Sequence, residues 1–91
     1  RYRDLIEHSP EMIYQLNKAG QFVHVNKTGL DKLGYTLEEM LQMHLWDLVP
    51  KGREAEVLAY LERLVSQGRS TIETVFVAAD GRPIDVEIHS T

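Results

Sequence analysis

The four histidines of this chain, His8, His24, His44 and His89, are the residues best suited to bind a metal ion or haem. Imidazole nitrogen is a common metal ligand, but a zinc site needs three or four ligands that converge on one point. His24 and His89 each lie in an alternating segment, on the side opposite to its most apolar residues. We therefore expect surface or helix-capping roles for all four, and no metal site.

Other reactive groups are also few. The chain has no cysteine, which excludes disulfides, thiolate nucleophiles, cysteine-ligated zinc and iron–sulfur clusters. Its paired carboxylates, such as Glu38–Glu39 and Glu54–Glu56, stand near expected helix starts, where solvated charge is the ordinary interpretation. No serine lies in a nucleophile-elbow pattern, and no glycine loop could cradle a phosphate. We therefore expect no catalytic residue.

Composition limits the remaining classes of function. The 91 residues are expected to form one domain over 1–91, with 43% hydrophobic and 26% charged residues, as in ordinary globular domains. The net charge of −4 argues against nucleic acid and anionic membranes as partners, because both attract a basic face. No apolar run approaches the roughly 20 residues that span a bilayer, so we expect no membrane insertion and a cytoplasmic location.

The elements that would position a site follow from apolar spacing and turn signals. Proline disfavours helix in the residue before it, so Ser9-Pro10 ends a leading helix. Alternating residues around Gly20, and again around Asp80-Gly81, predict two hairpins. The expected order is a leading helix, a hairpin, a helical segment and a second hairpin, over residues 1–9, 12–25, 26–67 and 70–90.

The helical segment carries the strongest local signals. Asn26 suits the N-cap of a first helix, and Gly34 suits its C-terminal end. Thr36 and Glu39 have the spacing of a capping box for the next helix. A longer helix is expected from about Arg53 to Gln67, with one apolar stripe formed by Val57, Leu58, Leu61, Leu64 and Val65.

The order of these motifs resembles the PAS domain, a sensory module of many two-component kinases, cyclic-dinucleotide enzymes and transcription regulators. The resemblance covers essentially the whole chain and implies an α+β fold, with an antiparallel sheet flanked by short helices on one face. Five segments carry it: Ser-Pro-Glu-Met-Ile at 9–13, Gly-Gln-Phe-Val-His-Val-Asn at 20–26, Leu-Gly-Tyr-Thr-Leu-Glu-Glu-Met-Leu at 33–41, Trp-Asp-Leu-Val-Pro at 46–50, and Asp-Gly-Arg at 80–82.

The resemblance also implies a gap in the sheet. The PAS sheet has five strands, and the fifth lies in the centre, between the first and the fourth. This chain reaches Thr91, at the end of the fourth strand. We therefore expect the fifth strand to be absent, cut off or disordered, or its pairing to come from a neighbouring chain. Direct pairing of the first strand with the fourth would contradict this expectation.

A cavity between the sheet and the helices is the main candidate site for a small-molecule ligand. The alternative is that its side chains simply fill the core. Tyr14 and Trp46 carry polar groups that would orient a ligand. The candidate lining residues are Tyr14, Leu16, Val25, Leu45, Trp46, Val57, Leu61, Phe76, Val86 and Ile88. On the leading helix, Tyr2, Leu5 and Ile6 are expected to pack on the outer sheet face or to form a homodimer interface.

The resemblance implies a regulatory sensory and dimerisation module of a larger signal-transduction protein, such as a histidine kinase or diguanylate cyclase. The module would relay a ligand or partner signal to a covalently linked output domain. The alternative is a redox or light sensor that holds haem or flavin without a covalent bond. We predict no cofactor, because the flavin adduct of the LOV branch needs a cysteine and residues 53–67, where haem-binding relatives usually place a ligand, contain no histidine. A free-standing enzyme is the weakest hypothesis.

Overall fold

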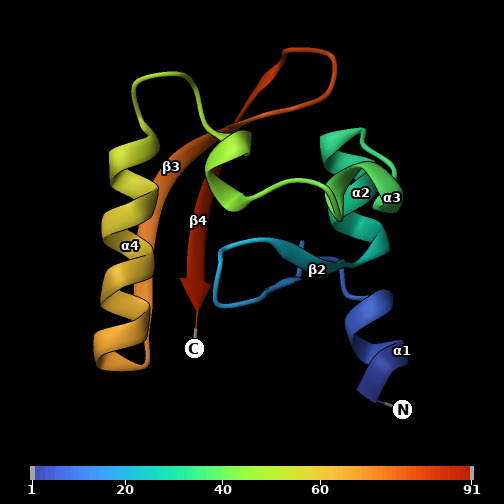
Figure 1. Cartoon of the computed structure of the whole chain (residues 1–91). Helices are drawn as coiled ribbons and strands as arrows, with labels where there is room; N and C mark the ends of the chain where they lie inside the picture. Colours follow the sequence, from blue (N-terminus) through green and yellow to red (C-terminus); the bar gives the residue numbers. More distant parts are fainter. Residues whose placement is uncertain (1, 91) are drawn as a thin grey trace.

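The computed structural model describes residues 2–90, and for Tyr2 the backbone only. Two hairpins are separated in the chain by a run of helices, and α4 lies alongside β3 (Figure 1). Within residues 2–90, no helix has both the length and the apolar character needed to cross a membrane. The elements in chain order are α1 (Tyr2–Glu7), β1 (Tyr14–Leu16), β2 (Phe22–Val25), α2 (Lys27–Leu33), α3 (Leu37–Met40), the 3-10 helix η1 (Leu45–Leu48), α4 (Glu54–Gln67), β3 (Ser70–Val77) and β4 (Pro83–Ser90).

The strands form two separate antiparallel pairs, β1–β2 and β3–β4. Over the described residues β1 is not paired with β4, so the gap expected at the centre of the sheet is confirmed. The β3–β4 register is continuous, from Ser70 opposite Ser90 to Val77 opposite Pro83. The β1–β2 register is interrupted, because it shifts between Gln15 and Leu16. The second hairpin is therefore the more regular one.

The turns of the two hairpins have different surroundings. In the second turn, Gly81 adopts φ +87 and donates its N–H to Ala78, which is the bulged three-residue connection that favours glycine. No atom lies within 4 Å of the point where a Cβ of Gly81 would stand. In the first turn, Gly20 adopts φ +79, and a Cβ there would lie 2.7 Å from the Trp46 ring. The first turn therefore packs on the core, whereas the second stands clear of it.

The helix ends follow the local signals in the sequence. Asn26 caps α2 by accepting the N–H of Gly29, and Gly34 ends the helix at φ +80. The capping box of α3 is present, with Thr36 and Glu39 each accepting the other's backbone N–H. These predicted caps are confirmed, because each depends only on residues within a few positions of one another.

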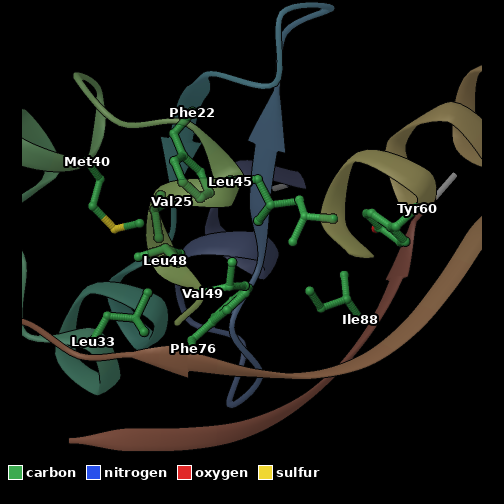
Figure 2. Close-up of a cluster of buried hydrophobic side chains, with 11 residues drawn as sticks. Phe22, Val25, Leu33, Met40, Leu45, Leu48, Val49, Tyr60, Phe76 and Ile88 are labelled. Carbon is green, nitrogen blue, oxygen red and sulfur yellow. The ribbon is translucent and has the colours of Figure 1, made fainter. Parts of the chain in front are cut away.

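Side chains from both hairpins and from the helices between them meet in one hydrophobic core (Figure 2). The strands contribute fully covered residues such as Phe22 and Phe76, and α4 contributes Tyr60. The buried apolar residues are Phe22, Val25, Leu33, Met40, Leu45, Leu48, Val49, Val57, Tyr60, Phe76, Ala78 and Ile88.

The apolar stripe predicted on α4 is wrong at two positions. Leu58 is 46% exposed and Val65 is 85% exposed, whereas Tyr60 is fully buried. The face of α4 that meets the core carries Val57, Tyr60 and Leu61, at the spacing i, i+3 and i+4. Leu58 and Val65 are seven residues apart and lie on the flank of this face.

Candidate functional site

A cleft of about 480 Å³ opens between the unpaired edges of β1 and β4, and we call it the central cleft. Residues 11–14 form one wall and residues 86–90 the other, with Lys32 of α2 at the rim. The walls carry apolar side chains, among them Met12, Tyr14, Val86 and Ile88. Ile88 is a buried member of the core and the other three pack against it, so the cleft borders the core.

The β4 wall presents backbone hydrogen-bonding groups to the cleft. Ala78 donates its N–H to the carbonyl of Arg82, so these two residues form a hydrogen-bonded pair of the antiparallel ladder. In the β3–β4 register, every second residue of β4 from Arg82 onward, namely Ile84, Val86, Ile88 and Ser90, is therefore hydrogen-bonded to β3. The N–H and C=O groups of Asp85, Glu87 and His89 therefore point away from β3. This is an open strand edge, and open edges are templates for another strand or peptide.

The β1 wall presents a matching edge. Asn26 donates its N–H to the carbonyl of Ile13, 2.9 Å away, which turns the odd-numbered residues of this strand toward β2. By the same alternation, the backbone groups of Met12 and Tyr14, which line the cleft, point away from β2. Both walls can therefore bind an extended group, such as a peptide strand, in which hydrogen-bond donors and acceptors alternate.

Hydroxyl groups add polarity to the inner part of the cleft. The buried hydroxyl of Tyr14 has no hydrogen-bond partner among the described residues. Burial, together with the nearby Tyr60, raises the pKa of the Tyr14 phenol above its ordinary value, so the group stays neutral at physiological pH. Tyr60 hydrogen-bonds the Ser90 hydroxyl at the end of β4, and burial also raises the pKa of Tyr60. The Tyr14 hydroxyl is thus a buried neutral group beside Tyr60, on a side chain that lines the cleft.

The rim of the cleft is charged and exposed. Lys32 and Glu11 carry opposite charges there, and Glu87 lies beside His89, with 2.7 Å between Oε1 and Nε2. The hydrogen bond from His89 is the main reason that the pKa of the Glu87 carboxyl is lowered, with Glu73 next. Since the rim carries charges of both signs, the cleft does not select strongly for one sign of charge.

The structure places all ten predicted pocket residues in or against one core cluster. Val25, Leu45, Val57, Phe76 and Ile88 are buried members, and the others pack on them. Only three of the ten, namely Tyr14, Val86 and Ile88, also line the central cleft.

Trp46 lies apart from the lining of the cleft. Its ring packs against Gly20 and stacks on His44, with 4.6 Å between ring centroids and 15° between the ring planes. Trp46 is therefore placed to hold the first turn rather than to meet a ligand in the cleft.

Sequence reasoning missed several residues of the site. Tyr60 could have been found, because it stands three residues after Val57 on the core side of α4. Lys32, Glu11 and Ser90 gave no comparable signal, because only the folded arrangement brings them to the cleft.

The histidines occupy separate environments. His24 contacts Glu7 of α1 at 3.1 Å, His89 contacts Glu87, and His44 stacks on Trp46. In the described part of the chain, no group of three or more histidine, cysteine, aspartate or glutamate side chains could hold a metal ion.

A second hollow, of about 650 Å³, lies between α1 and the other face of the first hairpin. Ile6 and Ile13 line it, and two apolar side chains in this region are exposed, Leu5 at 73% and Val23 at 49%. The side chain of Tyr2, also predicted at this surface, lies outside the described part of the chain. Leu5 thus remains uncovered by the rest of the domain.

Comparison with known proteins identifies the fold. The family model of the PAS fold matches residues 6–91. The PAS domain of an HTR-like protein from Haloarcula marismortui is 29% identical, with a TM-score of 0.84, over 98% of this chain and 74% of that one. A domain of the sensory box sensor histidine kinase/response regulator from Geobacter sulfurreducens is 27% identical, with a TM-score of 0.85, over 97% of this chain and 77% of that one.

A longer relative is the methyl sulfide methyltransferase-associated sensor of Methanosarcina acetivorans. It is 26% identical over 89 residues, which make up 97% of this chain and 9% of that protein. The chain thus spans a small part of this relative, and the solved relative from Geobacter sulfurreducens is a domain of a sensor histidine kinase/response regulator. Since the family model covers nearly all of its residues, this chain belongs to the PAS family, as a module of the sensory signalling type.

Proposed function

We propose that this chain is the regulatory module of a larger signalling protein, in which occupancy or repacking of the central cleft is relayed to a covalently linked output domain. The observation that supports this most is the cleft itself, because it brings the unpaired edges of β1 and β4 next to core side chains such as Tyr14 and Ile88. A group bound there would shift the balance between two packings of the domain, provided that it binds one packing more tightly.

The test uses the full-length protein that contains this domain. Val86→Arg places a charged side chain in the cleft, and Val65→Arg places the same side chain on the exposed flank of α4. The output to measure is autophosphorylation, or formation of a cyclic nucleotide from its triphosphate. We expect Val86→Arg to change the output and Val65→Arg to leave it as in the wild type. Unchanged output in both folded variants would contradict the proposal.

The proposal includes no bound cofactor. The hydroxyl-bearing cleft and the scattered histidines favour a small polar ligand or a peptide edge over haem or flavin. An absorption spectrum of the purified chain checks this point, because haem and flavin both absorb visible light. A coloured protein would support the alternative of a cofactor-bearing sensor.

The proposal also includes a homodimer through α1 and the hairpin face beside it, in the cytoplasm. Leu5 and Val23 supply the exposed apolar surface, and Ile6 borders the hollow between them. Sedimentation equilibrium of the wild type, Leu5→Glu and Val65→Glu tests this interface. We expect Leu5→Glu alone to weaken the dimer, and a monomeric wild type would contradict the interface.

A further inference from the structure

Asn26 is a polar residue in the interior of the protein, with 0% of its surface exposed. Its side-chain oxygen accepts the N–H of Ile13 at 2.9 Å and the N–H of Gly29 at 3.0 Å. Its side-chain nitrogen donates to the carbonyls of Ile6 at 2.8 Å and Glu11 at 2.9 Å. An amide offers two acceptor lone pairs and two N–H donors, so this side chain has all of its hydrogen bonds satisfied.

One side chain therefore caps two helices. The bond to Gly29 caps the start of α2, and the bond to the Ile6 carbonyl caps the end of α1. α1 has six residues, and helices this short do not hold together in water without tertiary contacts. Further ties to α1 and its loop are the half-exposed Glu7–His24 pair and the bond from the Thr28 hydroxyl to the Ser9 carbonyl.

The same amide also holds one wall of the central cleft. Glu11 and Ile13 line the cleft and bond to Asn26, while Ile6 bonds to it from α1. The start of α2 packs tightly against this wall, because a Cβ on Gly29 would stand 2.7 Å from Val25 and 2.9 Å from Met12. The cleft wall, through Glu11 and Ile13, and α1, through Ile6, are thus attached to one planar group.

We infer that Asn26 is the positioning residue through which a displacement of the cleft wall at residues 11–13 reaches α1. The amide is rigid and its four partners stand in fixed directions, so it cannot follow Glu11 and Ile13 and still bond to Ile6. The Ile6 bond is released first, because α1 has few other ties to the domain. This inference rests on the proposed function, in which the cleft wall is the part that moves.

We call the hydrogen bonds from the Asn26 side chain to Ile6, Glu11 and Ile13 the clamp, and its effect can be measured at α1 itself. The chain has no cysteine, so Arg3→Cys gives a single attachment point for a nitroxide, at an exposed side chain of α1 other than the proposed dimer contacts Leu5 and Ile6. In this labelled chain, Asn26→Ser keeps a hydroxyl that can cap Gly29 but is too short to reach Ile6. We expect a marked rise in label mobility in the paramagnetic resonance spectrum, and about tenfold less hydrogen-exchange protection in α1.

Thr36→Ala is the matched control, because it removes the cap of α3, whose partner is local, and has no bond to α1. The label should keep its wild-type mobility in this variant. If Asn26→Ser does not fold, as judged by circular dichroism, Asn26→Asp replaces it, since aspartate keeps both acceptors and loses both donors. A folded Asn26 variant with wild-type label mobility would overturn the clamp.

The relay from the cleft is tested by combining variants. Met12→Ala empties part of the cleft wall next to Gly29. We expect it to raise label mobility when Asn26 is present and to add nothing in the Asn26→Ser background. No effect of Met12→Ala alone, or equal effects in both backgrounds, would overturn the relay. The test needs neither ligand nor output domain, so the relay can fail while the output response to Val86→Arg still stands.

Discussion

The two hairpins of this domain are stabilised in different ways. The first has strands of three and four residues with an interrupted register, and it is joined to α1 and α2 by the side chain of Asn26. The second has two strands of eight residues in continuous register. It also tolerates two buried hydroxyls, of Ser70 and Thr74, without partners among the described residues. The first hairpin therefore depends on single residues, whereas the second is stabilised by many equivalent backbone hydrogen bonds.

The largest effect is expected from Asn26→Ala. Removing the amide takes one hydrogen bond from each of four backbone groups, of which the Ile6 carbonyl keeps only a longer bond, of 3.4 Å, from the N–H of Ser9. Each buried unsatisfied group costs about 1–3 kcal/mol unless water reaches it. We expect the free energy of unfolding to fall by about 3–5 kcal/mol, measured by urea denaturation.

Asn17→Ala is its control, because the Asn17 side chain also accepts two backbone bonds, from Ala19 and Gln21, but is exposed to solvent. Its loss should be about 1 kcal/mol. Equal losses in the free energy of unfolding of the two variants would show that Asn26 stabilises the fold no more than an exposed turn asparagine.

Substitutions at two glycines, Gly29 and Gly81, compare how tightly the surroundings of the two hairpins are packed. A Cβ on Gly29 would overlap Val25 and Met12, so Gly29→Ala should cost about 1–3 kcal/mol through displaced core atoms. Gly81 has open space around it and needs only its positive φ, so Gly81→Ala should cost about 1 kcal/mol. Thermal unfolding of both variants measures the difference, and a larger loss at Gly81 would reverse our ranking.

The second hairpin should even gain from losing a polar atom. Thr74→Val removes a buried hydroxyl without a partner in the described chain, while keeping a branched side chain suited to a strand. We expect a gain of roughly 0–1 kcal/mol in the free energy of unfolding. Thr71→Val, on the exposed side of the same strand, serves as the reference and should change little, because it loses only an exposed bond of 3.3 Å to His89. A clear loss at Thr74 would mean that its hydroxyl is satisfied in solution.

The smallest effect concerns acid stability. The pKa of Glu87 is lowered in the folded protein, mainly by its bond to His89, so the carboxylate stabilises the fold above the unfolded pKa of about 4.3. This contribution is lost as pH falls through the lowered folded value. Glu87→Gln should therefore show a slightly weaker decline of stability on acidification below that point. Identical acid unfolding curves for wild type and variant would show that this exposed pair contributes nothing measurable.

Local features of the fold could be predicted from the sequence. The caps at Asn26, Gly34 and Thr36, and the turn at Gly81, involve residues a few positions apart, so their types and spacing are sufficient. The gap in the sheet followed from the family resemblance rather than from any single residue.

Non-local features could not be predicted in the same way. The apolar pattern of α4 did not distinguish core from flank, because Leu58 and Tyr60 both fit a helical stripe until a neighbouring strand selects one. Asn26 was predicted as a local cap, yet its bonds to Ile6 and Glu11 span 20 and 15 residues. The ten pocket candidates are core residues, and the partners that turn three of them into a cleft wall come from elsewhere in the chain.

The contrast between the two turns has a practical consequence for engineering. The turn at Gly81 is exposed, and apart from its chain neighbours no atom lies within 4 Å of a Cβ placed on this glycine. Such loop tips accept inserted segments well. A fluorescent protein or an affinity tag could be spliced in there with the ladder of β3 and β4 left whole. The turn at Gly20 offers no such entry point, because the Trp46 ring already occupies the space that an insert would need. Of the two hairpin turns, the one at Gly81 is thus the permissive tip for attaching a reporter, on the opposite hairpin from Asn26.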